Sequence, residues 1–225
     1  MTKLAIQAAA GLAFFIGTLA AALFVGGGTT HYWQAWLYLA VFTGCVLVIT
    51  IDLAVRDPAL LERRVKAGPV AEPSAMQKLI QSIAGLAFLA VFVVSALDHR
   101  FGWSQVSVEA VAAGDVLVAL GLAIVFFVFR ANTFTSATVE VSEDQQLVST
   151  GPYGVVRHPM YSGALVMLLG TPLALGSWRG LAAVPVLAAV IVWRLLDEER
   201  LLTRELAGYA DYAKRVRRRL VPFVW

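Results

Sequence analysis

The sequence predicts an all-α protein that crosses a membrane about six times. Of its 225 residues, 59% are hydrophobic and only 15% are charged, whereas soluble domains average about 45–50% apolar and about 25% charged residues. A chain of this length cannot bury so much apolar surface in one water-bounded core. The apolar residues also fall in runs of about 20, the length of a membrane-spanning helix. No repeat or low-complexity linker divides the chain, so one domain over residues 1–225 is expected.

Six apolar runs define the predicted spans. They are Ala5–Val25, Trp33–Val55, Leu79–Leu97, Val108–Phe129, Met160–Trp178 and Leu181–Leu196. Only two residues separate the last two runs, and each of these runs contains a proline. We therefore expect a tight helical hairpin whose helices are kinked or do not fully span. Residues 1–130 would form a four-helix membrane scaffold, and residues 131–225 would form the ligand-binding and catalytic region.

Positive charge predicts the orientation in the membrane. Under a six-span topology, 16 lysines and arginines lie on the face of the two termini, and only Arg100 and Arg179 lie on the other. Because positively charged loops stay in the cytoplasm, we expect both termini and the polar segments 131–159 and 197–225 to be cytoplasmic. Any chemistry should occur where these two segments meet the membrane.

Cysteine and histidine are too few for several kinds of site. Cys45 is the only cysteine, which excludes an intrachain disulfide and a thiolate metal cluster. The three histidines lie far apart, so no metal site is expected, and no nucleic-acid partner is expected either. The segment 56–78 is expected to be a polar connector. Four further residues are expected to have structural roles and no part in a functional site. Those residues are His31 and His99, expected in exposed loops, and Glu109 and Asp115, expected at the outer interface.

The most distinctive polar stretch is 147–163, LVSTGPYGVVRHPMYSG. Its glycines permit close backbone approach or positive φ. Pro159 favours an extended conformation at His158 and suits the first turn of the next helix. Arg157 and His158 are therefore expected at the positively polarised N-terminus of a membrane helix. The alternative is a membrane-entry loop in which Arg157 reaches toward headgroups, but so many glycines, prolines and tyrosines in one stretch favour a ligand site.

A second polar cluster follows the sixth run. Arg194 and Glu198 are spaced i,i+4 on one helix face and are expected to pair. One carboxylate of Glu198-Glu199 would face the loop at 151–158 and bind a cationic or hydroxyl-rich group, and a solvated helix end is the alternative. Tyr209 and Tyr212 would lie on one side of a short helix, where they pack on the hairpin or line a pocket. The basic run that follows favours attraction to anionic lipids.

The C-terminal part, about residues 138–225, resembles the isoprenylcysteine carboxyl methyltransferase family and its phospholipid methyltransferase relatives. The matching elements are Leu147-Val148, Gly151-Pro152-Tyr153, Arg157-His158-Pro159-Met160-Tyr161-Ser162-Gly163, Glu198-Glu199, Tyr209 and Tyr212, and Leu220-Val221-Pro222-Phe223. The resemblance implies an integral membrane enzyme that transfers a methyl group from S-adenosylmethionine to a lipophilic acceptor and leaves S-adenosylhomocysteine. It also implies a cofactor pocket built from C-terminal loops and helices.

The resemblance also implies residue roles. Arg157 and Glu199 would be catalytic, with Arg157 holding an anionic acceptor in bidentate fashion and Glu199 binding the ammonium or ribose of the cofactor. The remaining residues would bind the cofactor, with tyrosine faces against its sulfonium. They are Gln145, Leu147, Val148, Gly151, Tyr153, His158, Pro159, Tyr161, Gly163, Glu198, Tyr209 and Tyr212. Gln145 stands where many relatives carry a histidine. Methyl transfer is an in-line displacement that depends mainly on alignment.

Several alternatives stay open. The acceptor could be a prenylated cysteine carboxylate, a phospholipid amine or a small thiol. A membrane reductase related to sterol reductases, with a nicotinamide cofactor, is a rival class that the RHPxY motif disfavours. A non-enzymatic scaffold or small transporter is another, and the near absence of charge within the apolar runs argues against an ion pathway.

Overall fold

The computed structural model describes residues 2–141, 145–222 and 224–225, and these residues form helices and no β-strand. The all-α prediction is therefore confirmed. The α-helices are α1 (Thr2–Gly27), α2 (Trp33–Arg56), α3 (Pro58–Val65), α4 (Ala75–Phe101), α5 (Val108–Ala131), α6 (Pro159–Ala174), α7 (Val184–Glu205) and α8 (Tyr209–Arg215). Three short 3₁₀ helices are η1 (Pro69–Ala71), η2 (Gly151–Gly154) and η3 (Arg179–Ala183).

Five helices are long and apolar enough to cross a membrane. They are α1, α2, α4, α5 and the segment Arg179–Glu205 that contains α7. The sixth apolar helix, α6, has 16 residues and is about 24 Å long at 1.5 Å per residue, less than the ~30 Å of a bilayer core. The expectation that one helix of the C-terminal pair does not fully span agrees with this length. The orientation of the helices in the membrane stays a prediction.

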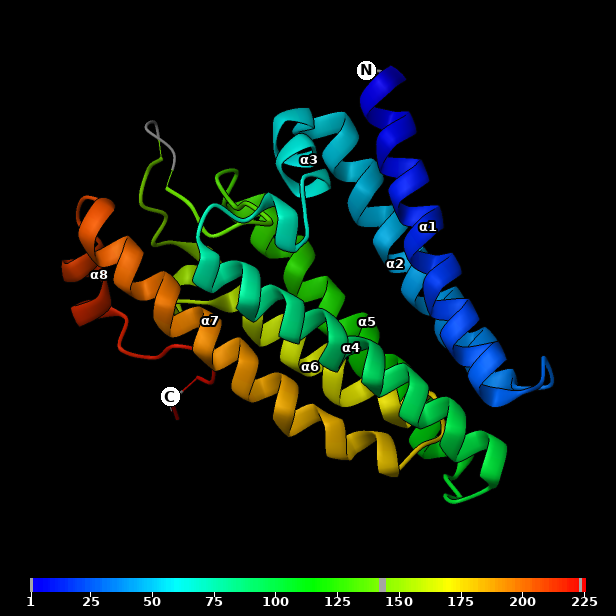
Figure 1. Ribbon diagram of the computed structural model, residues 1–225. Helices are drawn as coiled ribbons and strands as arrows, with labels where there is room; N and C mark the ends of the chain where they lie inside the picture. Colours follow the sequence, from blue (N-terminus) through cyan, green and yellow to red (C-terminus); the bar gives the residue numbers. More distant parts are fainter. Residues whose placement is uncertain (1, 142–144, 223) are drawn as a thin grey trace.

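The connecting segments gather at two ends of the bundle. The segments 57–74, 132–141, 145–158 and 206–222 lie toward the upper left of Figure 1, and the short turns at 28–32, 102–107 and 175–183 lie toward the lower right. We call the first group the site end. The polar segments that the sequence predicts to be functional are therefore together, and the same end includes the connector between α3 and α4.

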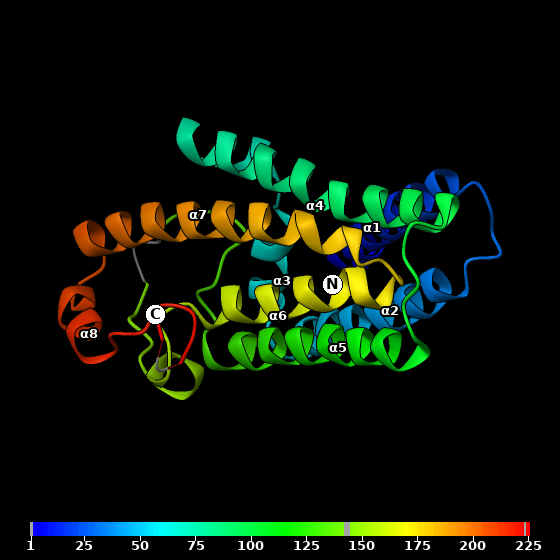
Figure 2. The same cartoon turned by 90° about the horizontal axis from the view of Figure 1, so that it is seen from below.

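Glycines bring α5 and α6 into close contact. A Cβ atom on Gly163 would lie 2.7 Å from the carbonyl oxygen of Gly121, and one on Gly170 would lie 2.5 Å from that of Gly114. Small residues of this kind let membrane helices approach backbone to backbone. Although α6 and α7 follow one another through a short turn, α6 packs mainly on α5 and α7 packs mainly on α4, as Figure 2 shows. The two helices of the predicted hairpin are therefore neighbours in the sequence, but each packs mainly on another helix.

Two ordinary interpretations need correction. His99 lies in α4 instead of a loop and stacks on Tyr32, with ring centroids 3.8 Å apart. Asp115 is buried in α5, and its place at the outer interface stays a prediction. The connector 56–78 is not simply polar chain, because it contains α3, and its Glu72 is only 2% exposed.

Candidate functional site

A cavity of about 970 Å³ at the site end brings the two polar motifs together. One side is formed by the segment before and at the start of α6, and the other by the end of α7 and by α8. The predicted site residues that line it are Gln145, Leu147, Val148, Tyr153, Arg157, His158, Pro159, Tyr161, Glu198, Tyr209 and Tyr212. Segments about 40 residues or more apart in the sequence thus surround one space large enough for a cofactor-sized molecule.

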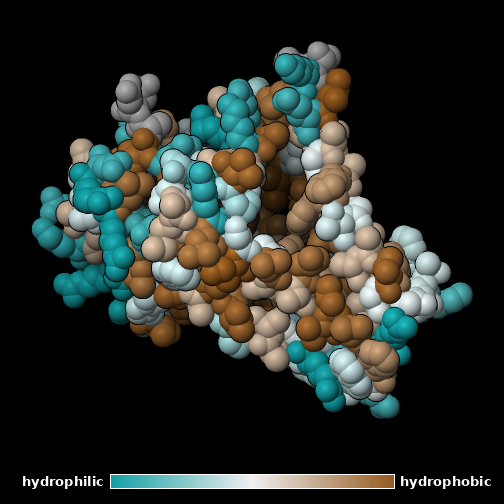
Figure 3. Space-filling view, in the orientation of Figure 1, coloured by the Kyte–Doolittle hydropathy of each residue, from teal (hydrophilic) through white to brown (hydrophobic). Residues whose placement is uncertain are grey.

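The cavity continues from this polar region into the apolar interior of the bundle. Its inner walls come from five helices and consist of Phe15, Phe88, Leu122, Met167, Leu187 and Ile191, among other apolar residues. Figure 3 shows a hollow with hydrophobic walls near α3 on the face of the molecule seen in Figure 1. A ligand with a polar head and an apolar body would find a matching surface for each part.

Arg157 is held by the C-terminal part of the chain. The backbone N–H groups of Arg157 and His158 donate to the carbonyl oxygens of Arg218 and Arg219, at 2.9 and 3.0 Å. The guanidinium Nη1 donates to the carbonyl oxygens of Val216 and Arg217, at 3.0 and 3.2 Å. These carbonyls follow α8, where carbonyl groups lack helical partners. Most of this guanidinium is therefore used to fasten the chain beyond α8 to the start of α6.

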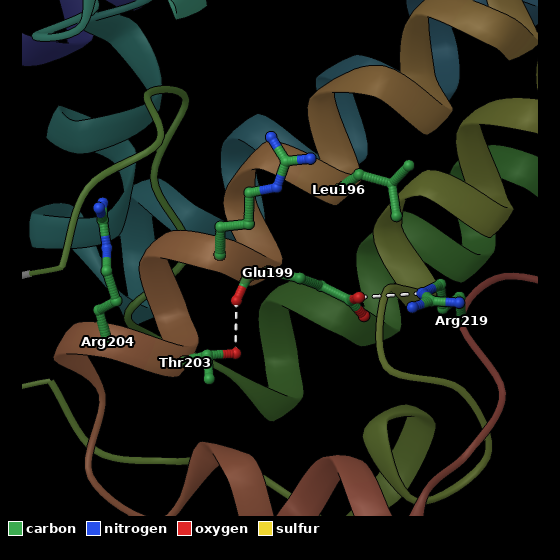
Figure 4. Close-up of a pocket in the computed structure, with 6 residues that line it drawn as sticks. Leu196, Glu199, Thr203, Arg204 and Arg219 are labelled. Carbon is green, nitrogen blue, oxygen red and sulfur yellow. Dashed lines mark hydrogen bonds and ion pairs between the residues drawn. The ribbon is translucent and has the colours of Figure 1, made fainter.

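Glu199 is the common partner of three donors. Its Oε1 accepts from Arg157 Nε at 2.7 Å and lies 3.2 Å from His158 Nε2, while its Oε2 accepts from Arg219 Nε at 2.9 Å. Glu199 does not line the large cavity but a neighbouring one of about 620 Å³, shown in Figure 4. The predicted catalytic carboxylate thus lies behind Arg157 and His158.

Glu198 is the carboxylate of the pair that faces the large cavity. Tyr161 Oη donates to Glu198 Oε2 at 2.6 Å and accepts from Arg194 Nε at 3.2 Å. This chain of contacts fixes both the tyrosine and the carboxylate at the cavity wall. The sequence left open which of the two adjacent glutamates faces the loop, and the register of α7 supplies the answer.

Arg194 has a different partner from the predicted one. Its Nη2 forms a salt bridge with Oε1 of Glu72 at 2.7 Å, and its Nη1 donates to Oε1 of Gln77 and Gln81 at 3.1 and 3.0 Å. The expected i,i+4 pair with Glu198 is therefore replaced by a long-range one. Sequence reasoning missed Glu72 because a single glutamate in a proline-rich connector carries no spacing signal.

Three tyrosines and an asparagine form another part of the cavity wall. Tyr212 Oη donates to the carbonyl oxygen of Tyr153 at 2.8 Å, and Asn132 Nδ2 donates to Tyr153 Oη at 3.1 Å. Burial raises the pKa of Tyr153 to about 12 and also raises the pKa values of Tyr209 and Tyr212, so all three phenols keep their protons at neutral pH. The sequence analysis missed Asn132, which lies three residues after the end of the fourth apolar run.

Tyr209 carries an unsatisfied polar atom. Its side chain is buried, and its Oη has no hydrogen-bond partner within the described part of the chain. A buried hydroxyl without a partner costs on the order of 1–3 kcal/mol. Since this residue lines the large cavity, a polar ligand group there would remove the cost.

Two predicted cofactor-binding glycines have other positions. Gly163 does not line the cavity, because it lies in the contact between α6 and α5 described above. Gly151 begins η2 with φ of +59°, a conformation that glycine adopts without a steric penalty. It shapes the turn that carries Tyr153 and is not part of the cavity wall.

Comparison with known proteins relates part of this chain to a family of membrane enzymes. Residues 110–208 match the model of a family described as phospholipid methyltransferase. An 88-residue stretch is 38% identical to protein-S-isoprenylcysteine O-methyltransferase B of Arabidopsis thaliana, covering 36% of this chain and 42% of that protein. A 128-residue stretch is 31% identical to a delta(14)-sterol reductase of Mus musculus, covering 49% of this chain and 31% of that protein.

A third relative is the nickel-cobalt-cadmium resistance protein NccN of Alcaligenes xylosoxydans xylosoxydans, 25% identical over 129 residues, or 56% of this chain and 58% of that protein. The chain therefore spans less than two thirds of the length of each of these relatives. The matches confirm the predicted resemblance. The apolar helices and the relatives together identify an integral membrane protein whose region 110–208 is related to membrane methyltransferases.

Proposed function

We propose that this protein transfers a methyl group from S-adenosylmethionine to a lipophilic acceptor in the membrane. The observation that carries the proposal is the single cavity shared by the motif 145–161 and by Glu198, Tyr209 and Tyr212. Its polar region would take the cofactor, and its apolar region inside the bundle would take the acceptor. Both reactants would then meet beside the start of α6.

The polar groups of this region fit the proposed cofactor. Glu198 accepts one hydrogen bond from Tyr161, and a carboxylate has about four acceptor positions, so positions remain for an ammonium or for ribose hydroxyls. The Oη of Tyr209 needs a partner, which a polar ligand group would supply. When bound, the cofactor supplies an electrophilic methyl group on a sulfonium, and neutral tyrosine rings suit the neighbourhood of such a cation.

In this proposal Arg157 and Glu199 are positioning residues. Arg157 donates to Glu199 and to carbonyl groups after α8, which leaves little of its guanidinium for an anionic acceptor. Glu199 in turn holds Arg157 and His158 from behind. The pair would keep His158 and Pro159 at the cavity wall, so that reactants are aligned for displacement. The apolar inner walls would exclude water from the transferred methyl group.

The acceptor is proposed at the level of a class. The apolar part of the cavity reaches Phe15 of α1 and Phe88 of α4, so it suits a molecule with a long hydrocarbon portion. An isoprenylcysteine carboxylate is the acceptor that the resemblance favours, and a phospholipid amine or a lipophilic thiol has the same general form. A carboxylate or thiolate needs positioning and no general base, in keeping with the positioning role given to Arg157 and Glu199.

A second candidate function is reduction of a sterol-like substrate with a nicotinamide cofactor. The 31% identity to a sterol reductase over 128 residues favours it. The family model for residues 110–208 favours methyl transfer. Both candidate functions need a cofactor that contains adenosine and a second, apolar substrate, so the cavity alone does not distinguish them. A binding measurement is needed for that.

Isothermal titration calorimetry on the full chain in nanodiscs tests the proposal with S-adenosylhomocysteine and with NADPH. We expect binding of S-adenosylhomocysteine that weakens roughly 10- to 100-fold in Glu198→Gln, because a charge-assisted hydrogen bond contributes about 1.5–3 kcal/mol. The matched control is Glu205→Gln, an exposed glutamate at the end of the same helix, which should bind as the wild type does. Binding of NADPH alone would support the reductase. Binding of neither would support the non-enzymatic alternative.

A further inference from the structure

The second cavity at the site end lies on the outer side of α7. It has a volume of about 620 Å³ and is lined by Leu196, Glu199, Arg200, Thr203, Arg204 and Arg219. Figure 4 shows how five of these side chains lie around the last turns of α7 and the C-terminal segment. We call this cavity the arginine pocket. It is distinct from the large cavity, since no residue lines both.

Positive charge in the arginine pocket is not balanced. Its single carboxylate, Glu199, is already engaged by Arg157 and His158 from the far side and by Arg219 from within the pocket. Arg200 and Arg204 form no ion pair or hydrogen bond with any described residue. Two arginines without an ion-pair partner among the described residues and a third that is neutralised only in part line one pocket, which makes it a site for an anion.

The position of the pocket along α7 indicates what that anion is. Leu196, Arg200 and Arg204 are spaced i,i+4 and share one helix face, and Trp193 on the preceding turn is 40% exposed. The candidate span that contains α7 ends at Glu205, so this face changes from apolar to cationic toward the C-terminal end of that span. Arginine and tryptophan at such a boundary lie at the level of lipid headgroups.

Trp225 adds a second aromatic group, which contacts Arg219. The guanidinium of Arg219 lies 5.0 Å from the ring centroid of Trp225, a cation–π contact that holds the arginine at the pocket edge. Thr203 Oγ1 donates to the carbonyl oxygen of Glu199, so it can still accept a hydrogen bond. Leu196 contributes an apolar side chain to the pocket lining. An anion bound here would have an apolar surface next to its charged group.

We propose that the arginine pocket binds the phosphate of an anionic phospholipid headgroup. Arg200, Arg204 and Arg219 would contact the phosphate, and the apolar face that begins at Leu196 and Trp193 would contact the glycerol and the upper part of the acyl chains. The phosphate of a soluble molecule offers the same charge without the apolar part. The lipid is favoured because the pocket lies at the end of a membrane span.

Native mass spectrometry of the detergent-solubilised full chain tests this site with phosphatidylglycerol and phosphatidylcholine as probes. We expect phosphatidylglycerol to bind about tenfold more tightly than phosphatidylcholine, since charge-assisted contacts to phosphate depend on net negative charge at the site. The double variant R200Q/R204Q should lose this preference. The control R215Q/R218Q removes two exposed arginines outside the pocket and should keep it.

Three results would overturn the proposal. If the two double variants lost the preference for phosphatidylglycerol equally, general surface charge would be what attracts the lipid. An equal affinity for both lipids in the wild type would mean that the pocket does not select an anion. Full competition by soluble glycerol 3-phosphate at concentrations similar to those of the lipid would mean that the site takes free phosphate. A thermal unfolding midpoint within about 2 °C of the wild type ensures that each variant is folded.

Discussion

Arg194 of α7 and Glu72 of the connector between α3 and α4 form a buried salt bridge with an Nη2–Oε1 distance of 2.7 Å. Glu72 Oε2 also accepts from the backbone N–H of Val139 at 3.1 Å, and Arg194 Nη2 donates to the carbonyl oxygen of Ala137. One ion pair thus joins the connector, the loop before η2 and α7. Because Arg194 also contacts Tyr161, the N-terminal half of the chain supports the wall of the cavity.

Breaking this pair from one side should be strongly destabilising. In Arg194→Met, Glu72 keeps its charge at 2% exposure with no cation beside it, which costs about 3–5 kcal/mol for a buried pair. The double variant Arg194→Met/Glu72→Gln should cost clearly less than the sum of the single changes, as measured by urea unfolding in detergent micelles. Arg56→Gln serves as the control, because its ion pair with Asp52 is half exposed and should contribute less than about 1 kcal/mol. Additive effects of the two changes would contradict a direct pair.

The glycine contact between α5 and α6 gives a second prediction. In Gly163→Ala the new methyl group would lie 2.7 Å from the carbonyl oxygen of Gly121 and 3.1 Å from Ile124, so the helices must separate. We expect a loss of about 1–3 kcal/mol, as for other overpacked interiors, measured as a lower thermal unfolding midpoint. Gly44→Ala in α2 is the matched control, since nothing lies within 4 Å of its new methyl group. Because alanine favours a helix more than glycine does, Gly44→Ala should not lose stability, and a similar loss in both variants would show that the close contact with Gly121 is not responsible.

The unsatisfied hydroxyl of Tyr209 separates stability from ligand binding. Tyr209→Phe removes a buried Oη that has no partner among the described residues, so the variant without ligand should be as stable as the wild type or slightly more so. Its stabilisation by S-adenosylhomocysteine should be smaller. Tyr212→Phe loses the hydrogen bond to the carbonyl oxygen of Tyr153 and should lose about 1 kcal/mol without ligand. Unfolding midpoints measured with and without S-adenosylhomocysteine check both variants. If the ligand stabilises Tyr209→Phe as much as the wild type, Tyr209 is not part of the site.

Much of the architecture was predictable because membrane helices must satisfy their backbone within each segment. Hydropathy alone therefore located the runs that became α1, α2, α4, α5 and α7. The motif 147–163 also contained local information, since Pro159 begins α6 and Gly151 adopts positive φ. Such features depend on neighbours in the sequence, and sequence reasoning is strong there.

The unpredicted parts depend on contacts between distant segments. Arg194 pairs with Glu72 instead of Glu198, and Gly163 packs against Gly121 instead of lining the large cavity. Nothing in the spacing of these residues distinguishes a partner one turn away from one on another helix. The same holds for Glu198 and Glu199, because adjacent residues on a helix point about 100° apart and only the packing of α7 decides which one faces the cavity.

The last prediction concerns the different roles of Glu198, which would bind the ligand, and Glu199, which holds Arg157 and His158. In Glu199→Gln, Arg157 keeps its charge at 6% side-chain exposure without a carboxylate, so the protein should lose about 3 kcal/mol of stability. Arg219→Gln removes a more exposed partner of the same carboxylate, 31% exposed, and should cost less than about 1 kcal/mol. Glu198→Gln should instead weaken the binding of S-adenosylhomocysteine and leave stability nearly unchanged. Its partner Tyr161 is an uncharged donor, and the amide oxygen of the new glutamine can accept the same hydrogen bond. Urea unfolding and calorimetry on the same preparations check this split. The reverse pattern, with stability lost in Glu198→Gln and only affinity lost in Glu199→Gln, would return Glu199 to the cofactor-binding role that the sequence resemblance implies.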